Sequence, residues 1–214
     1  MTLSVSEIFY SIQGESLYAG LSCSFVRLSG CNLRCRYCDT TYAYADGTPM
    51  PIADIIRKIK AFQCPRIEVT GGEPLLQDNT PRLITELLDR GYTTLLETNG
   101  SQNIRSVDER CIKIVDIKCP GSGESHKTDF SNLDHLKAHD QLKFVLTGRE
   151  DFNYAINLLL DKWGLNPPVP ILFAPAFGLL EPAQLAAWIL KERLPVRLQL
   201  QIHKLIWPTI LRGV

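Results

Sequence analysis

The sequence lacks an excess of either charge, because its 23 lysines and arginines are matched by 23 aspartates and glutamates. A balanced chain has no overall attraction to nucleic acid or to an anionic membrane, and we expect neither as a partner. It also lacks any apolar run near the ~20 residues that a membrane-spanning helix needs. Its first residues show no basic segment followed by an apolar core, which is the pattern of a secretory signal. Together these absences favour a cytoplasmic protein.

The chain also lacks the signature of a disulfide framework. Its seven cysteines are an odd number, and three of them are crowded into one short segment. Disulfide-rich chains are usually smaller and use an even number, so the cysteines indicate a reducing compartment and a metal site. No repeat, linker or low-complexity segment divides the 214 residues, and 45% of them are hydrophobic. We therefore expect residues 1–214 to form a single domain.

Apolar residues predict an alternation of strands and helices. The expected strands cover residues 24–29, 66–70, 93–97, 112–117, 142–147, 169–174 and 196–202, and the expected helices cover 52–62, 80–90, 151–163 and 181–193. Short connections between these elements imply parallel strands joined by crossover helices. A complete eight-unit barrel needs ~250 residues, and this chain offers about six units. We predict an α/β fold with a parallel sheet, as an incomplete (β/α)6-type TIM-like barrel; an open doubly wound sheet is the alternative.

The segment from Cys31 to Cys38 is the most informative part of the chain. Cys31, Cys35 and Cys38 have the spacing C-x3-C-x2-C. The same spacing could form one face of a buried helix, although Gly30, Asn32 and other polar neighbours favour a loop. A structural zinc site would need a fourth ligand, and none lies at the usual paired spacing. Three thiolates can instead hold three irons of a four-iron cluster and leave the fourth iron open to a substrate.

A second motif, Thr70-Gly71-Gly72-Glu73-Pro74, follows the strand expected at residues 66–70. Two glycines at a strand end let the backbone approach a ligand closely, although Gly-Gly and Glu-Pro also form ordinary tight turns. Polar residues also end the next two strands, at Glu97 and at Asp116. Because active sites of such barrels gather at the carboxyl ends of the strands, we expect these segments to share one site.

The cysteine spacing, with Tyr37 directly before the last cysteine, resembles the radical S-adenosylmethionine (SAM) superfamily. The glycine motif is similar to the segment that receives the SAM amino group there. The segments Glu7–Ser16, Phe25–Leu33 and Cys38–Thr40 resemble the 7-carboxy-7-deazaguanine synthase family, and the resemblance continues through Gln201–Lys204. That resemblance implies a pared-down radical SAM barrel and a lyase reaction in queuosine and 7-deazapurine biosynthesis. The reaction converts 6-carboxy-5,6,7,8-tetrahydropterin to 7-carboxy-7-deazaguanine with loss of ammonia.

The resemblance also implies cofactors and the residues that hold them. Cys31, Cys35 and Cys38 would ligate a [4Fe-4S] cluster, and Thr40 would ligate Mg2+. The implied SAM contacts are Tyr37, Cys38, Asp39, Gly72, Asp116, Ile117, Lys118, Phe173, Ala174, Pro175 and Ala176. The implied substrate contacts are Ile12, Gln13, Gly14, Glu15, Arg27, Thr70 and His203.

Among these, Arg27 suits a carboxylate through two charge-assisted bonds, and Gln13 and Glu15 can match the donors and acceptors of a pterin edge. Without the resemblance, Arg27 could equally face solvent, and His203 could be a core histidine. The C-terminal segment 207–214 runs past the point where some family members end with a carboxylate near the substrate.

Partners and rival functions remain open at this point. The resemblance implies an electron donor such as flavodoxin or ferredoxin, a small-molecule pterin substrate, and a homodimer. One rival is another small radical SAM enzyme, such as a glycyl-radical activase, whose substrate would be a protein. The segment Gln13-Gly14-Glu15 argues against that rival. A second rival is a non-catalytic iron–sulfur or zinc module.

Overall fold

A single curved sheet is the centre of the computed structural model, which describes residues 1–164 and 166–214. Its strands are β1 (Thr2–Ile12), β2 (Ser22–Leu28), β3 (Thr48–Pro51), β4 (Arg66–Gly71), β5 (Thr93–Thr98), β6 (Ile112–Lys118), β7 (Gln141–Leu146), β8 (Ile171–Pro175) and β9 (Arg197–Leu198). The nine strands lie in the order β3-β1-β2-β4-β5-β6-β7-β8-β9. From β2 to β9 neighbouring strands are parallel, whereas β1 pairs antiparallel with β2 and β3.

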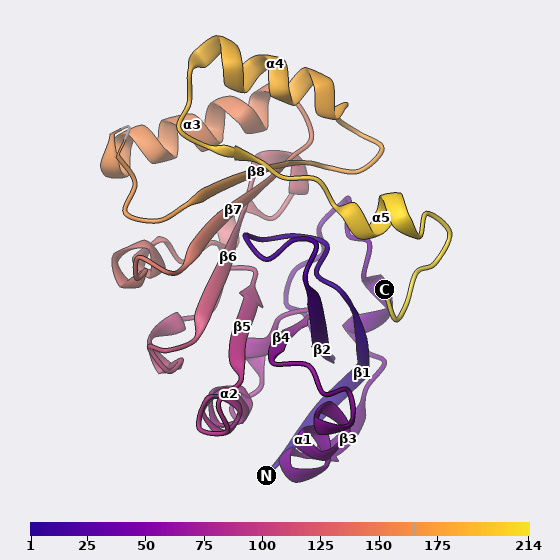
Figure 1. Ribbon diagram of the computed structural model, residues 1–214. Helices are drawn as coiled ribbons and strands as arrows, with labels where there is room; N and C mark the ends of the chain where they lie inside the picture. Colours follow the sequence, from indigo (N-terminus) through magenta and orange to yellow (C-terminus); the bar gives the residue numbers. More distant parts are fainter. Residues whose placement is uncertain (165) are drawn as a thin grey trace.

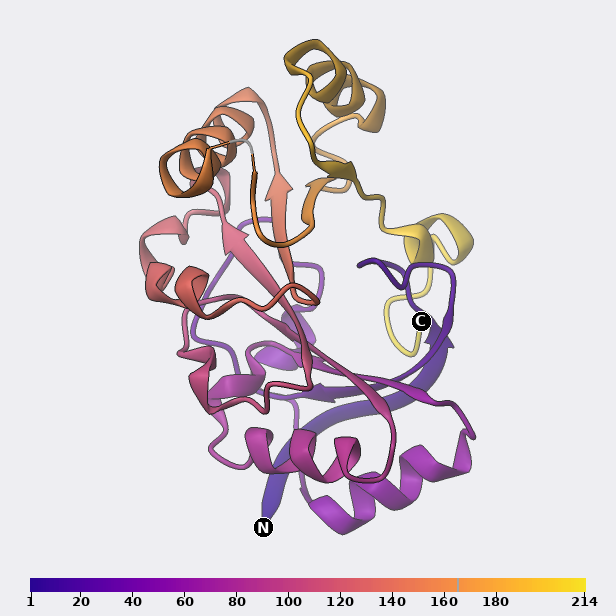
Figure 2. The ribbon, with the colours of Figure 1, turned by 60° about the vertical axis from the view of Figure 1, so that its left-hand side comes forward.

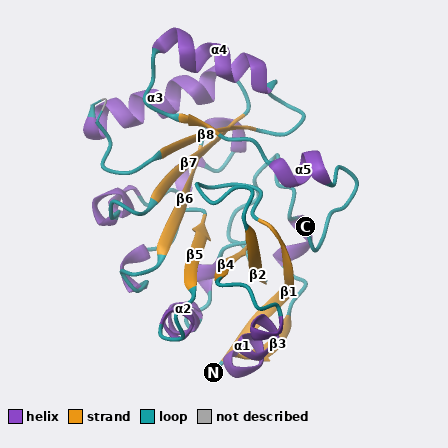
Figure 3. Ribbon diagram, in the orientation of Figure 1, coloured by secondary structure: helices purple, strands orange, loops and turns teal. Residues whose placement is uncertain are grey.

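The helices cover the outer face of this sheet. They are α1 (Ile52–Ala61), α2 (Thr80–Leu88), α3 (Arg149–Trp163), α4 (Pro182–Glu192) and the short α5 (Ile202–Ile206). Figures 1 and 3 show α1 to α4 outside the curved sheet. Figure 2 shows that the sheet does not close on itself and that α5 lies on its open side. The predicted incomplete barrel with a largely parallel sheet is therefore confirmed.

Two apolar clusters occupy the layer between the sheet and the helices. One joins α1 and α2 to β1, β2 and β4, and includes Ile55, Leu83 and Val69. The other joins α3 and α4 to β6, β7 and β8. In the second cluster, the ring of Phe173 meets Phe144 and Phe152 edge-on, with ring centres 5.6 and 5.8 Å apart. Such edge-to-face contacts add to the burial of these large rings.

Alternation along the strands gives the sheet a second, polar face. On β4, Ile67 and Val69 belong to the apolar cluster, whereas Glu68 and Thr70 line the interior of the open barrel. On β7, Phe144 packs in the other cluster and Lys143 lines the interior. Successive strand residues point to opposite faces, so each strand supplies both core and interior.

Three elements differ from the sequence-based expectation. β1 and β3 were not predicted. A register shift between Val5 and Glu7 interrupts the alternation of apolar and polar residues along β1, so the sequence does not show a regular strand pattern there. The strand expected at residues 196–202 is only two residues long. The following segment leaves the sheet, and residues 202–206 form α5. In the described part of the chain, no helix has the length and apolar character to cross a membrane.

We expect Phe152→Ala to lower the free energy of unfolding by about 3–5 kcal/mol, because it leaves a cavity among Phe173 and Trp188. Leu190→Ala is the control, since Leu190 is 76% exposed on α4 and should matter by less than about 0.5 kcal/mol. Denaturant titration followed by circular dichroism measures both. Equal stability of the two variants would contradict the packing described for α3.

Candidate active site

A cavity of about 520 Å3 opens inside the curved sheet, at the carboxyl ends of the parallel strands. It is lined by the parallel strands and their carboxyl ends, by the segment after β1, by the cysteine loop after β2 and by the C-terminal segment. Most of the residues predicted for the site line this cavity, namely Ile12, Gln13, Gly14, Glu15, Arg27, Cys31, Cys35, Tyr37, Cys38, Asp39, Thr40, Thr70, Gly72, Asp116, Lys118, Ala176 and His203. The strand ends converge as parallel-barrel geometry predicts.

Four predicted residues do not line the cavity: Ile117, Phe173, Ala174 and Pro175. Ile117 and Phe173 belong to the apolar cluster on the opposite face of the sheet. Two consecutive residues of a strand cannot both direct their side chains into one cavity. The side chains of Ile117 and Phe173 are therefore unavailable to a ligand bound there. Matching the chain to a family pattern residue by residue does not show which way a side chain points.

The cysteine segment is a loop and not a helix face. Arg36 N donates to Ser122 O at 3.0 Å, and Cys38 N donates to Cys35 O at 3.1 Å, which fixes the loop against the segment after β6. Cys31 Sγ accepts from Leu33 N at 3.4 Å. The three half-buried thiols face one cavity, as a shared multi-iron cluster would require. The other four cysteines, Cys23, Cys64, Cys111 and Cys119, are free and buried.

The glycine motif packs directly on the cysteine loop. Glu73 N donates to Gly30 O at 2.8 Å, and Gly72 N donates to Leu28 O at 3.2 Å. A Cβ atom on Gly72 would lie 2.4 Å from Gly30 O and 2.6 Å from the Cβ of Cys31. Only glycine permits this approach, because real Cβ atoms do not make contacts that short.

The carboxylate of Glu73 is completely buried and is hydrogen-bonded within the protein. It accepts from Leu75 N at 2.9 Å, from Thr98 Oγ1 at 2.9 Å and from Asn99 N at 2.7 Å. These bonds tie the loop after β4 to the end of β5. The motif therefore presents its backbone to the cavity, while its carboxylate is occupied within the protein.

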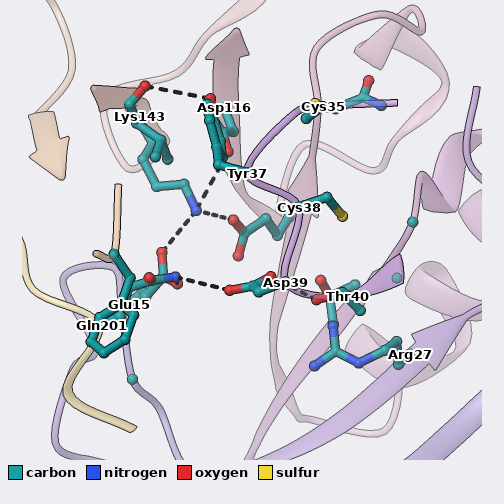
Figure 4. A pocket seen from close by; sticks show the side chains of 18 of the residues that line it. Glu15, Arg27, Cys35, Tyr37, Cys38, Asp39, Thr40, Asp116, Lys143 and Gln201 are labelled. Carbon is teal, nitrogen blue, oxygen red and sulfur yellow. Dashed lines mark hydrogen bonds and ion pairs between the residues drawn. The ribbon is translucent and has the colours of Figure 1, made fainter. Parts of the chain in front are cut away.

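Arg27 faces the cavity in a fixed orientation and does not point to solvent (Figure 4). Its Nε donates to Glu7 Oε1 at 2.7 Å, and the Tyr42 hydroxyl donates to the same oxygen at 2.7 Å. Glu7 lies opposite Arg27 in the antiparallel register of β1 and β2. The sequence analysis missed Glu7, because its role depends on a strand that was not predicted.

The segment after β1 and the C-terminal segment complete the cavity together. Ile202 N donates to Gly14 O at 3.0 Å, and a Cβ atom on Gly14 would lie 2.0 Å from His203 Nδ1. Gln201 Nε2 donates to Glu15 Oε1 at 2.8 Å. Val214 also lines the cavity. The C-terminal segment therefore closes the site over the residues that follow β1.

Charged side chains gather on the interior face below this closure. Figure 4 shows Lys143 of β7 between Glu15 and Asp116. Lys143 also contacts Glu97, and Gln13 Nε2 donates to Glu68. Burial raises the pKa of Glu68 to about 8, and the nearby carboxylate of Glu97 adds to the effect. Lys143 and Glu68 were not predicted, and the signal that could have found them is a polar residue inside an otherwise buried strand.

The pair Asp39 and Thr40 follows the cysteine loop. Thr40 Oγ1 donates to Asp39 Oδ1 at 2.9 Å, and Lys204 forms an ion pair with Asp39. Burial would raise the pKa of Asp39, but Lys204 holds it well below the usual range. Within residues 1–164 and 166–214, no group of three or more His, Cys, Asp or Glu side chains is arranged to hold a single metal ion.

Solved structures support the fold. QueE from Escherichia coli superposes with a TM-score of 0.74 at 21% identity, covering 93% of this chain and 94% of that one. SuiB from Streptococcus suis, bound to S-adenosylmethionine, gives a TM-score of 0.56 at 15% identity, covering 79% of this chain and 48% of that one. At such low identities these likenesses show the fold alone.

Some curated relatives are more similar to this chain in sequence than these solved structures are. A sequence model of the Radical SAM superfamily matches residues 25–119. The 7-carboxy-7-deazaguanine synthase of Chlorobaculum tepidum is 47% identical, covering 99% of this chain and 97% of the relative. That of Koribacter versatilis is 39% identical, covering 99% of this chain and all of the relative. The chain belongs to the 7-carboxy-7-deazaguanine synthase family, within the radical SAM superfamily.

Proposed function

We propose that this radical SAM enzyme converts 6-carboxy-5,6,7,8-tetrahydropterin to 7-carboxy-7-deazaguanine with loss of ammonia, in queuosine and 7-deazapurine biosynthesis. One observation carries the proposal: the three thiols, the glycine motif and a polar, charged pocket all line one cavity. The same activity is named for relatives that match the chain over nearly its full length. These relatives weigh against a glycyl-radical activase and against a non-catalytic metal module.

Membership of the radical SAM superfamily implies a [4Fe-4S] cluster and SAM, and the chain has residues that fit both. Cys31, Cys35 and Cys38 would hold the cluster. When bound, the cluster and SAM together supply a radical that abstracts hydrogen from the substrate. The residues nearest SAM would be Tyr37, Cys38, Asp39, Gly72, Asp116, Lys118 and Ala176 by their cavity-facing atoms, with Ala174 and Pro175 next to them on β8 and with Ile117 and Phe173 limited to backbone contacts.

The substrate would occupy the part of the cavity closed by α5. Glu15 and Gln13 present acceptor and amide groups that match the edge of a pterin, with Ile12, Gly14, Thr70 and His203 around them. Arg27 retains two terminal nitrogens for a substrate carboxylate, because its Nε is occupied by Glu7. The chain thus binds the two ends of the substrate with groups of opposite charge.

Magnesium is a further part of the proposal. The hydroxyl of Thr40 is a hard oxygen that lines the cavity directly after the cysteine loop. Mg2+ commonly binds one or two protein oxygens and completes its shell with water and substrate oxygens, so a single hydroxyl fits this mode. There the ion would orient and polarise the substrate carboxylate.

The remaining parts of the proposal rest on the family relationship. We propose a flavodoxin or ferredoxin as the electron donor, a homodimer in the cytoplasm, and one catalytic domain over residues 1–214. The single sheet to which all strands of the described residues belong supports the last point.

The decisive experiment is an anaerobic assay of the reconstituted enzyme with SAM, a reductant and the carboxytetrahydropterin. Mass spectrometry should detect 7-carboxy-7-deazaguanine. Cys35→Ala should lose the cluster and all turnover, because a thiolate ligand is removed. Cys111→Ala should retain its iron, since Cys111 is buried away from the cavity. Full iron content in Cys35→Ala, or no product from the parent, would refute the proposal.

Gly72→Ala should lower iron content and SAM affinity at least severalfold, because its Cβ would collide with Gly30 and Cys31. Gly148→Ala is the matched control, since a Cβ there meets nothing within 4 Å and its φ of 178° suits any residue. Iron analysis and isothermal titration with SAM measure the difference. The close packing would have no functional role if both variants behaved like the parent.

Arg27→Lys should weaken substrate binding about tenfold to a hundredfold, because a charge-assisted bond contributes ~1.5–3 kcal/mol and lysine lacks the planar fork. Cleavage of SAM without substrate should persist. Arg110→Lys, outside the cavity, is the control. Titration with the pterin gives the affinities, and an unchanged value for Arg27→Lys would exclude the anchor.

Thr40→Val keeps the shape of the side chain and removes its hydroxyl. We expect the variant to lose the stimulation of turnover by Mg2+, with little change in iron content or SAM affinity. Rates measured across a magnesium titration test this. A response equal to that of the parent would show that Thr40 is not the ligand.

A further inference from the structure

Lys143 is a buried cation at the centre of the charged group inside the sheet. Its side chain is only 5% exposed, and its neighbour in sequence, Phe144, packs in the apolar core on the other face. Its Nζ lies 2.8 Å from Glu15 Oε2 and 3.7 Å from Asp116 Oδ2, and it also contacts Glu97 (Figure 4). One ammonium group therefore joins the segment after β1 to β5, β6 and β7.

The three carboxylates do not depend on Lys143 equally. Asp116 Oδ2 has a closer cation, Lys118 Nζ at 2.7 Å. Burial raises the pKa of Glu97 and outweighs the attraction of Lys143. Burial would also raise the pKa of Glu15, but Lys143, with a hydrogen bond from Gln201, lowers it to about 2. Glu15 is the carboxylate on which Lys143 and two further donors, Gln199 and Gln201, converge, and together they favour its anion.

The rest of the surroundings of Glu15 fix its orientation. Gln201 Nε2 donates to Oε1 at 2.8 Å, and Gln199 Nε2 donates to Oε2 at 3.1 Å. The adjacent backbone is held by Gln199 Oε1, which accepts from Ser16 N at 2.9 Å. Among the described residues, Lys143 is the ion-pair partner of Glu15, whereas Gln199 and Gln201 donate from neutral amides.

We propose that Lys143 is a positioning residue that fixes Glu15 so that its Oε1, which in the described part of the chain accepts from Gln201 alone, can accept an N–H of the 2-amino group of the bound heterocycle. It would thereby select a 2-amino-4-oxo ring edge over a 2,4-dioxo edge. The inference rests on the proposed function, because it takes Glu15 to contact the pterin. An anionic carboxylate accepts an N–H bond well, whereas the oxygen of a carbonyl group in place of the 2-amino group would face it with a partial negative charge and no hydrogen.

The first test compares substrate affinities of cluster-loaded enzymes. Lys143→Met should bind 6-carboxytetrahydropterin about tenfold to a hundredfold more weakly, the range expected for a charge-assisted bond. Lys143→Arg keeps the charge and should bind more tightly than Lys143→Met. Lys113→Met is the matched control, because Lys113 is equally buried, pairs with Asp140 at 3.3 Å and lies outside the cavity. It should bind the pterin like the parent, whatever its stability.

The second test measures selectivity, which a merely structural role would not change. The probe is the 2,4-dioxo analogue of the pterin, and the readout is the ratio of the two dissociation constants. The parent should favour the pterin by about a hundredfold or more, since a site built for N–H donors rejects an analogue that lacks one. Lys143→Met should reduce that ratio at least tenfold, because a protonated Glu15 can donate to the carbonyl oxygen.

Two outcomes would overturn the inference: unchanged pterin affinity in Lys143→Met, or a selectivity ratio equal to that of the parent. If Lys143→Met does not fold, Lys143→Gln replaces it under the same two criteria. Failure of the proposed function would look different, because the parent itself would neither bind nor convert the pterin. Binding by the parent with no effect at residue 143 would reject only the role of Lys143.

Discussion

The two-residue alternation of parallel strands is the constraint on which the structure depends. Each interior strand supplies apolar side chains to the layer under the helices and polar side chains to the open cavity. Val69 and Glu68 on β4, and Phe144 and Lys143 on β7, illustrate this division. A shift of one residue in any strand would place charges in the core and apolar groups in the cavity, so packing fixes the register of the site.

Burial inside the sheet gives the charged residues their properties. In water, Glu15 and Glu68 would have the same pKa. Inside the sheet, burial and the nearby Glu97 raise the pKa of Glu68 to about 8, whereas Lys143 lowers that of Glu15 to about 2. Removing an ion from water is unfavourable, so a single cation decides which of several neighbouring carboxylates stays charged. The cavity thereby combines carboxyl groups of raised and of lowered pKa with the cationic side chains of Lys143 and Arg27.

Local patterns in the sequence predicted much of the fold and the part of the site that is contiguous in sequence. The cysteine loop and the glycine motif were found because their spacing is informative by itself, and the parallel strands were found because they alternate regularly. The parts that were missed depend on contacts between distant segments. Glu7 matters through its pairing with Arg27 across β1 and β2, and the bulge in β1 hid that strand. Lys143 has no motif, and only the fold places it beside Glu15.

Closure of the cavity by α5 has a consequence for folding. The bonds that Gln199 and Gln201 make to residues 15 and 16 span 183 to 186 residues, whereas the bonds that hold the cysteine loop, such as those of Arg34 and Tyr37, span 90 to 108 residues. Contacts between such distant segments form late, because ordering the intervening chain must come first. We therefore expect the half of the site that carries the cysteines to resist local unfolding better than the half around Glu15. We expect the half that surrounds Glu15 to lose its structure first when the terminal segment opens, while the cysteine loop keeps its contacts with the segments after β4 and β6.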